Sequence, residues 1–552
     1  MAAKKPNFLI IVADDLGFSD TGPYGSEIAT PTLDRLAKEG LRMTDFHTAS
    51  ACSPTRAMLF SGTDSHIAGL GQMGEFIRKA PEQFKGRPGY EGYLNFRVAA
   101  LSEILQDAGY HTMMTGKWHL GLTTELAPAA RGFDACKAFL PGAGNHFNFE
   151  PQLDHEVPSF VKSDGFWMDN DRYLDRRTEL PKDYYSSDYF GSSLVDFLDK
   201  RTEAEHEKPF FAYLAFTAPH WPLQAPTEVL DKYRGMYNDG PEQLRLRRLA
   251  QLKKLGLVPE DVTPAPLVAP TKDWQEMDDQ ERAESARKME VYAAMVDRID
   301  QNIARVVAKL EATGELDNTF ILFMSDNGAE GSIMEALPMM RSTGLLDVIR
   351  DYYDNSLDNI GRGNSYTWYG PRWALAATAP SRGFKGWTTE GGIRCPCIVR
   401  YPPLTRSSNG GVAHNFTTVM DLLPTCLELA GVKHPGSTFR GREVVPVRGK
   451  SWVPFLAGNT EVVHNTETNV TGWELFGLRG IRRGDYKAVW MPPPRGAAKW
   501  ELYNLATDPG ETEDLADKET EVMERLMQDW EKYYAETGMF DVDMSKRGVS
   551  GI

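Results

Sequence analysis

The sequence predicts an α/β protein with a large sheet flanked by helices, followed by a smaller antiparallel sheet with a helix. Short apolar runs alternate with amphipathic stretches along most of the chain, as strands and helices do in α/β proteins. Several apolar runs end in polar residues, which is typical of strands that lead into a ligand site. After Pro435-Gly436 the pattern changes to short runs separated by turn residues.

Four apolar runs of strand length carry polar residues at their carboxyl ends. They are Asn7–Ala13 before Asp14-Asp15, His111–Thr115 before Gly116 to His119, Pro209–Thr217 before Ala218 to Trp221, and Thr319–Met324 before Ser325 to Gly328. In open α/β sheets, ligands bind at the carboxyl ends of the strands. We therefore expect the functional site at this edge of the sheet.

Helical periodicity is clearest from about Glu281 to Glu311, where apolar residues recur three or four positions apart. Gly314 follows this stretch at the position of a C-terminal cap. Two further helices are predicted over Thr418–Ala430, which precedes Gly431, and from Glu519 to about Glu536.

The C-terminal region has the pattern of an antiparallel sheet. Leu478–Arg482 and Tyr486–Trp490 flank a glycine-containing turn, which predicts a hairpin, and Trp500–Leu505 predicts another strand. We therefore divide the chain into a domain over residues 1–440 and a C-terminal antiparallel-sheet and helix subdomain over residues 441–552.

Composition and charge exclude several classes of protein. The 552 residues are 41% hydrophobic and 25% charged, with a formal net charge of −16 at pH 7, which is typical of a globular protein. This acidic balance argues against a nucleic-acid partner. Spread evenly, it would also repel an anionic substrate.

The sequence predicts a cytoplasmic protein with no membrane partner. No apolar run approaches the ~20 residues that span a bilayer. The N-terminal run Phe8–Ala13 is short for a signal peptide and ends in Asp14-Asp15 instead of a cleavage site. The five cysteines form an odd, sparse set, which favours a reducing compartment over a disulfide framework.

Two long turn-rich segments, Leu140–Pro181 and Ala329–Arg382, have no regular pattern. The second is dense in aromatic residues: Tyr352, Tyr353, Tyr366, Trp368, Tyr369 and Trp373. These side chains form either packed loop structure or an aromatic rim over a cleft that accepts an apolar group. The sequence leaves both alternatives open.

Paired carboxylates suggest a metal site. Asp14-Asp15 alone fit a helix cap or a solvent-facing loop, but Asp326-Asn327 follow a second predicted strand. Together the two strand ends offer several oxygen donors, which suit Ca²⁺ or Mg²⁺ better than zinc.

A second set of residues has the chemistry of anion binding and proton transfer. Cys52-Ser53-Pro54-Thr55-Arg56 opens a predicted helix, whose N-terminus favours an anion or a reactive group. The set also contains Lys117, His119, His220 and Lys385. Taken singly, each has an ordinary structural explanation, such as a capped helix with a buried cysteine or a solvated lysine. The functional hypothesis depends on their joint presence.

In this order along the chain, the motifs resemble those of the type I (formylglycine-dependent) sulfatases of the alkaline-phosphatase superfamily, especially bacterial-type arylsulfatases. The similarity extends almost end to end. It includes Asp14-Asp15-Leu16-Gly17, Cys52-x-Pro54-x-Arg56, Gly116-Lys117-Trp118-His119, Ala218-Pro219-His220, Ser325-Asp326-Asn327-Gly328 and Glu501-Leu502-Tyr503 with Asp508-Pro509. The resemblance implies a large mixed sheet flanked by helices, with residues 1–440 as the catalytic domain.

The resemblance also implies hydrolysis of aryl or alkyl sulfate monoesters, with a small-molecule sulfate ester and a formylglycine-generating maturation enzyme as partners. Cys52 would be oxidised to formylglycine, whose hydrated gem-diol is sulfated during the reaction. One calcium ion would be held by Asp14, Asp15, Asp326, Asn327 and the modified Cys52. The roles implied for the remaining residues are orientation of the gem-diol by Arg56, sulfate binding by Lys117 and Lys385, protonation of the leaving oxygen by His220 and proton removal by His119.

Two alternatives remain open at this stage. One is a phosphonate monoester or phosphodiester hydrolase of the same superfamily, and the other is a non-catalytic relative that binds sulfate esters and keeps an unmodified Cys52.

If calcium is bound, the implied site is positive although the whole chain is acidic, because three cationic side chains and the ion face three carboxylates.

Overall fold

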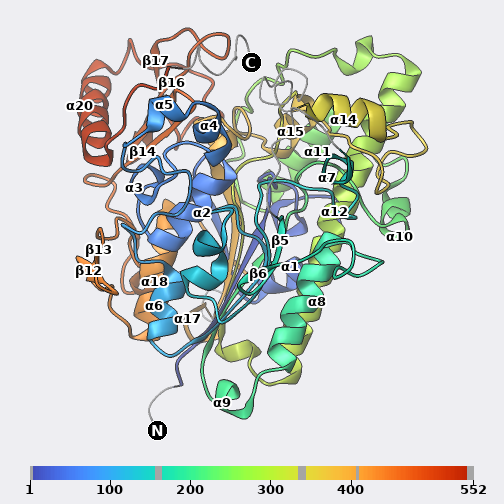
Figure 1. Cartoon of the computed structure of the whole chain (residues 1–552). Helices are drawn as coiled ribbons and strands as arrows, with labels where there is room; N and C mark the ends of the chain where they lie inside the picture. The colour runs from blue at the N-terminus through green and yellow to red at the C-terminus, as the bar shows by residue number, and fades with distance from the viewer. Residues whose placement is uncertain (1–3, 156–164, 334–343, 406–409, 544–552) are drawn as a thin grey trace.

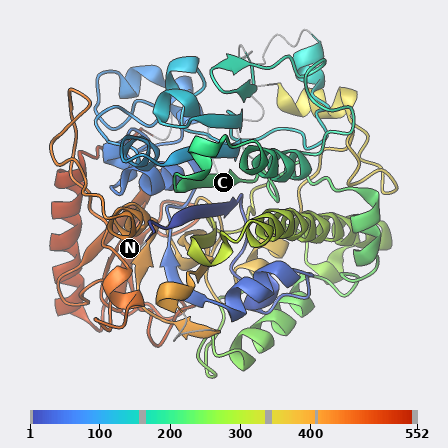
Figure 2. The same ribbon diagram turned by 90° about the horizontal axis from the view of Figure 1, so that it is seen from below.

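The computed structural model describes residues 4–155, 165–333, 344–405 and 410–543 (Figure 1). An 11-stranded mixed sheet forms its centre, in the order β10-β2-β9-β8-β1-β7-β3-β4-β5-β6, with β11 paired to β2. Helices cover both faces of this sheet (Figure 2). The predicted α/β architecture is therefore confirmed.

The four strands expected from the sequence lie at the middle of the sheet. β1 (Asn7–Ala13) matches its predicted range, and β3 (His111–Lys117), β7 (Phe210–Ala215) and β8 (Thr319–Ser325) differ by a few residues at their ends. β1 pairs in parallel with both β7 and β8. Their carboxyl ends consequently meet at one edge.

The remaining strands make the sheet mixed. β2 (Leu41–His47) and β9 (Arg394–Arg400) pair antiparallel, and β9 is also antiparallel to β8. Cys395 and Cys397 are buried on β9. The outer strands are β4 (Ala135–Phe139), β5 (Trp167–Asp169), β6 (Arg172–Tyr173), β10 (Gly411–Ala413) and β11 (Thr417–Thr418).

The core has two layers, one on each face of the sheet, because alternate side chains of a strand point in opposite directions. Ile11 of β1 packs in the cluster that includes α1 (Pro31–Lys38), α8 (Ser186–Asp199) and α12 (Asp279–Ala312). Ile10 packs on the other side with α2 (Cys52–Ser61), α6 (Leu101–Asp107) and α18 (Leu422–Ala430). Helix α12 confirms the longest predicted helix.

The shorter helices of the structure are α3 (Ser65–Ala68), α4 (Gly74–Lys79), α5 (Pro81–Phe84), α7 (Pro151–Asp154), α9 (Glu203–His206), α10 (Thr227–Leu230), α11 (Pro241–Lys254), α14 (Leu345–Tyr352), α15 (Pro371–Ala377), α16 (Glu390–Ile393), α17 (Pro402–Thr405) and α19 (Val453–Leu456).

A four-stranded antiparallel sheet lies toward the C-terminus, at the side of the molecule away from α8 (Figure 1). The hairpin of β15 (Leu478–Arg483) and β16 (Tyr486–Trp490) is as predicted, as are β17 (Trp500–Asn504) and helix α20 (Thr520–Thr537). The structure adds β14 (Val470–Leu475), which was not predicted from the sequence. The domain boundary after residue 440 stays a prediction.

Buried charges join the small sheet to the large one. Lys487 Nζ lies 2.7 Å from Glu390 Oε1 and 3.0 Å from Glu511 Oε1, and Glu390 Oε2 lies 2.8 Å from His47 Nε2. Arg482 pairs with Asp45 at 2.8 Å. We call these six residues the Glu390 network. Every one of them has a polar partner of suitable chemistry.

Two further expectations concern disulfide bonds and membrane-spanning helices. All five cysteines are free thiols in buried positions. Within the described residues, the helices are too short or too polar to cross a bilayer.

Candidate active site

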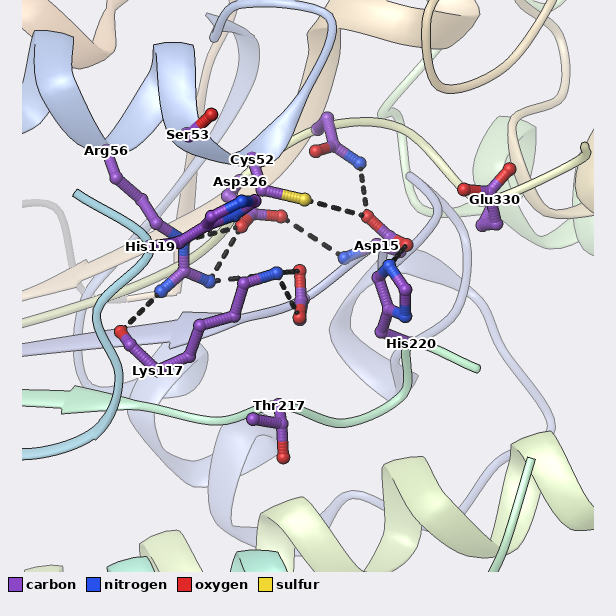
Figure 3. A network of polar contacts seen from close by, with 12 residues as sticks. Asp15, Cys52, Ser53, Arg56, Lys117, His119, Thr217, His220, Asp326 and Glu330 are labelled. Carbon is purple, nitrogen blue, oxygen red and sulfur yellow. Dashed lines mark hydrogen bonds and ion pairs between the residues drawn. The ribbon is translucent and has the colours of Figure 1, made fainter. Parts of the chain in front are cut away.

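The predicted site residues converge at the carboxyl edge of the large sheet, where the N-terminus of α2 also lies. Figure 3 shows side chains from segments far apart in the sequence pointing toward one another there. Asp14 and Asp15 follow β1, Asp326 follows β8, Lys117 ends β3, and Cys52 begins α2. The topology therefore brings together residues that are hundreds of positions apart in the sequence.

Three carboxylates and the Cys52 thiol form the acidic part of the site. Ligand atoms of Asp14, Asp15, Cys52 and Asp326 all lie within 4.8 Å of one another, and all four residues are buried. Asp15 has a φ of 67°, a left-handed conformation that is uncommon outside glycine. This turn directs the two adjacent carboxylates into the same small volume, and such backbone strain is typical of functional sites.

Asn327 completes the group of predicted metal ligands. Its Nδ2 donates to Asp15 Oδ1 at 2.7 Å. Its Oδ1 is buried and has no hydrogen-bond partner among the described residues. A buried amide oxygen without a partner is costly, and the amide of Asn327 contacts Asp15, one of the three clustered carboxylates. An oxygen-preferring cation would satisfy it, so the residues fit Ca²⁺ or Mg²⁺.

The electrostatics of Asp14 agree with that interpretation. Burial raises the pKa of Asp14 to about 7, opposed by Lys117 and reinforced by the neighbouring Asp326 and Asp15. In the protein alone, the carboxylates thus repel one another and lack full compensation. A divalent cation would supply the missing positive charge.

Cys52 is the first residue of α2, and Pro54 occupies the first helical turn, where proline is tolerated. Its side chain is buried, and its Sγ donates to Asp15 Oδ1 at 3.5 Å. Burial and the nearby Asp326 carboxylate raise the pKa of the Cys52 thiol well above its ordinary value. The unmodified thiol is therefore protonated and a poor nucleophile.

Cationic side chains alternate with the carboxylates. Arg56, one turn after Cys52, donates from Nε and Nη2 to Asp326 Oδ2 at 2.9 and 2.7 Å. Lys117 Nζ donates to both oxygens of Asp14, at 2.8 and 2.7 Å. Arg56 also donates to the Lys117 carbonyl at 2.8 Å, which fixes the end of β3 relative to α2.

Lys385 and His220 lie on the other side of Asp15. Lys385 Nζ is 2.8 Å from Asp15 Oδ2 and 3.1 Å from Glu330 Oε2. His220 Nε2 is 3.4 Å from Asp15 Oδ2, and its Nδ1 is 2.7 Å from the Trp221 carbonyl oxygen. Because a carbonyl only accepts, Nδ1 donates and Nε2 faces the site. Burial, Lys385 and Lys117 lower the pKa of His220 well below its ordinary value.

His119 is held by a residue that was not predicted from the sequence. Its Nε2 lies 3.2 Å from Glu75 Oε1, a carboxylate on the short helix α4. Glu330, the partner of Lys385, was also missed. Glu330 follows the Asp326-Asn327 pair closely, which is a usable signal, whereas Glu75 lies in a stretch without periodicity or a motif of its own.

The aromatic residues of the second long segment are mainly packed. Trp373 contacts Tyr237 and Trp274 in the core, and Tyr369 stacks on Tyr292. Trp221, Val348, Ile349, Tyr353 and Tyr366 form a separate buried cluster. The Trp221 ring lies 4.4 Å from that of His220. Packed structure thus accounts for most of these side chains, while one cluster adjoins the site.

Comparisons with known proteins agree with the geometry. The profile of the Sulfatase family matches residues 6–432, and that of the N-sulphoglucosamine sulphohydrolase C-terminal region matches residues 384–536. An uncharacterized sulfatase of Schizosaccharomyces pombe is 55% identical over 97% of this chain and 95% of its own. An arylsulfatase of Klebsiella aerogenes is 35% identical, with coverages of 81% and 91%.

Solved structures share the architecture. The crystal structure of Ps i-CgsB has a TM-score of 0.65 and 25% identity, and the match covers 96% of this chain and 93% of that one. The complex of BT4656 with its substrate D-glucosamine-2-N,6-O-disulfate has a TM-score of 0.59 and 20% identity, with coverages of 97% and 98%. The sequence matches and the shared fold together show that the chain belongs to the sulfatase family, as a type I sulfatase of the alkaline-phosphatase-like superfamily.

Proposed function

We propose that this protein hydrolyses aryl or alkyl sulfate monoesters to an alcohol or phenol and inorganic sulfate, using a formylglycine made from Cys52 and one calcium ion. The observation that carries the proposal is the convergence of Cys52 with three carboxylates and three cationic side chains in one buried volume. This set has an anchor for a cation, a position for a nucleophile and binding groups for an anion.

Asp14, Asp15, Asp326, Asn327 and residue 52 would hold the calcium. When bound there, calcium would lower the pKa of a hydroxyl on residue 52 and so favour a nucleophile at neutral pH. Formylglycine in its hydrated form would supply two hydroxyl groups on one carbon, one to attack sulfur and one to help release sulfate.

The chain's own cations bind the sulfate group. Lys117 and Lys385 each carry a positive charge into the volume around Cys52, and an ammonium group has three donors for anionic oxygens. Arg56 holds Asp326 through two hydrogen bonds and so fixes the geometry beside residue 52. In this buried site, such charges act more strongly than they would in water.

His220 provides the proton for the leaving oxygen. Its Nδ1–H is held by the Trp221 carbonyl, so proton transfer takes place at Nε2. Burial and two lysines disfavour the charged ring in the free protein. A bound sulfate ester brings a negative charge that favours it, which couples protonation of His220 to substrate binding.

His119 takes the proton of the remaining hydroxyl on residue 52 when sulfate leaves. It lies buried on the segment that follows Lys117, close enough for Lys117 and Arg56 to affect its pKa. A neutral imidazole is the form that accepts a proton, and burial favours that form.

The proposal also requires a maturation enzyme that oxidises Cys52. We infer a cytoplasmic location for the mature protein, because all five cysteines are unpaired thiols. No nucleic acid or membrane takes part in the proposed reaction.

Mass spectrometry of the peptide that contains Cys52, together with turnover of nitrophenyl sulfate, tests the proposal. We expect a formylglycine at residue 52 and release of one sulfate per nitrophenol. An unmodified thiol in fully active protein would contradict the mechanism. A strong preference for nitrophenyl phosphonate esters over the sulfate would contradict the proposed substrate class.

A further inference from the structure

The contact between Glu75 and His119 determines which ring nitrogen of the base is free. His119 Nε2 lies 3.2 Å from Glu75 Oε1. Although burial raises the pKa of Glu75, the facing His119 and Arg78 lower it below the ordinary value. Glu75 is therefore a carboxylate, which only accepts hydrogen bonds. Nε2 must then carry the hydrogen, and the neutral ring has its lone pair at Nδ1.

His119 Nδ1 is buried and has no hydrogen-bond partner among the described residues. A buried acceptor without a partner is costly unless a ligand uses it. This nitrogen is thus the free position of a ring whose other nitrogen is occupied. The same division of roles, with one nitrogen held by a carboxylate and the other reactive, is the general form of an oriented histidine base.

From this geometry we propose that Glu75 is the positioning residue for the base His119: it fixes the Nε2–H tautomer and stabilises the imidazolium that forms when Nδ1 accepts a proton. The inference rests on the proposed function for the identity of the proton donor. It adds a residue that the family motifs in this sequence do not contain.

The backbone around the pair restrains the ring further. His119 has a φ of 57°, in the left-handed region. A Cβ placed on Gly142 would lie 2.6 Å from Cε1 and 2.7 Å from Nε2 of His119, so only glycine leaves room for the ring. Glu75 Oε1 also lies 3.2 Å from Arg78 Nη2, which holds the carboxylate from the solvent side. The ring is thus restrained by Glu75 and by the backbone at Gly142.

The charges that face His119 come from three elements. Lys117 of β3 and Arg56 of α2 disfavour the protonated ring, as burial does, and Glu75 of α4 favours it. Glu75 is the source of negative charge that opposes the two cations, with Arg78 behind it. Removing the Glu75 charge should therefore lower the pKa of His119.

In the proposed reaction, His119 Nδ1 takes the proton of the free hydroxyl on the modified residue 52. The electrons of that O–H bond form the C=O double bond. The C–O bond to sulfate breaks, and its electron pair leaves with the sulfate. The imidazolium then returns its proton to water. Glu75 contributes to this step by keeping the charged ring favourable between two cationic neighbours.

Nitrogen NMR of the full chain with ¹⁵N-labelled histidine tests the pair without requiring turnover. His119 is assigned by loss of its signals in His119→Gln. We expect protonated Nε2 and unprotonated Nδ1 in the neutral ring of the wild type, and a lower His119 pKa in Glu75→Gln. Protonation at Nδ1 in the wild type, or an unchanged pKa in Glu75→Gln, would overturn the proposal.

Kinetics with nitrophenyl sulfate then test the role in the reaction. We expect Glu75→Gln to lower kcat by about 10- to 100-fold, to accumulate protein sulfated at residue 52, and to shift the acid limb of the kcat profile to lower pH. The matched control Glu82→Gln, an exposed carboxylate on the neighbouring α5, should behave as wild type. An unchanged pH profile and no accumulated adduct in Glu75→Gln would contradict the positioning role. A wild type that releases no sulfate would instead contradict the proposed function, while the NMR result still decides the pair.

Discussion

The molecule contains two buried charge clusters that differ in how completely their polar atoms are satisfied. In the Glu390 network, Lys487 lies between two carboxylates and the histidine and arginine each have an acidic partner. In the active site, the buried oxygen of Asn327 and Nδ1 of His119 have no partner among the described residues. Asp15 and His119 also adopt left-handed backbone conformations there.

This difference separates a structural cluster from a reactive one. The Glu390 network lies where the two sheets meet, and its ion pairs are complete within the chain. The active site repeats the alternation of acids and bases but leaves specific atoms open for a cation and for proton transfer. Both clusters contain buried charge, so buried charge alone does not identify the site. Between the two, the active site is distinguished by the partnerless atoms Asn327 Oδ1 and His119 Nδ1.

The largest contrast should come from cysteine substitutions. We expect Cys52→Ser to lower turnover by at least about a thousandfold, because a serine lacks the second hydroxyl and retains sulfate. Cys426 lies on the buried face of α18, so Cys426→Ala should retain turnover and lose stability through a small cavity. Sulfate release and denaturant unfolding measure the two effects. Rapid multiple turnover by Cys52→Ser would contradict the role of the second hydroxyl.

In the Glu390 network, substitution should affect stability first. Lys487→Met leaves Glu390 and Glu511 buried without their shared cation. We expect a loss of about 3 to 5 kcal/mol in the free energy of unfolding. Specific activity of the folded fraction should stay within about twofold. Denaturant titration with activity measured below the transition tests this, and lost activity at unchanged stability would remove the distinction between the clusters.

Removal of calcium should destabilise the protein through the active site and leave the Glu390 network, whose charges pair within the chain, unaffected. A ligand present at 100 times its Kd stabilises the folded state by about 2.7 kcal/mol, so a chelator should lower the thermal midpoint and added calcium should restore it. Asp326→Asn lacks one proposed ligand and should respond much less to either treatment. Differential scanning calorimetry measures the shifts. A wild-type midpoint that is insensitive to the chelator would contradict the metal site.

The last prediction concerns the pH dependence of stability. It depends on His66, a buried histidine whose two ring nitrogens both have carboxylate partners. Burial alone would lower the pKa of His66, but Asp64 and Glu474 raise it to about 9, above the ordinary value of 6.5. The protonated ring therefore stabilises the fold fully below pH 6.5, and this contribution is lost as the pH rises through about 9. At about 1.4 kcal/mol per pKa unit, we expect a loss of at most about 3 kcal/mol over that range. Denaturant unfolding at several pH values tests it, and His66→Gln should show a flatter profile.

Most of the central sheet was predictable because its strands are apolar and end in distinctive polar residues. The parallel strands β1, β3, β7 and β8 all have this pattern. Strand order was not predictable from local pattern, since β9 joins β2 and β8 through contacts distant in sequence. Strand β14 was missed because Val470–Leu475 contains a glycine and lacks strict alternation.

The site could be predicted where residues occur in motifs. The residues around Cys52, Asp326 and Lys117 were found in this way, and the structure places them together. Glu75 could not be found, because its importance depends on which side chain faces it across the fold. Its partner His119 is 44 positions away in sequence, and no periodicity or motif links the two.

The position of β1 has a consequence for synthesis of the chain. This wholly buried strand is made well before both of its neighbours, because β7 and β8 come from much later segments. While the ribosome is still producing those segments, an apolar strand with two unpaired edges is exposed to other chains. We therefore expect fragments that end before β8 to aggregate, and the nascent protein to depend on chaperones until its central strand is enclosed.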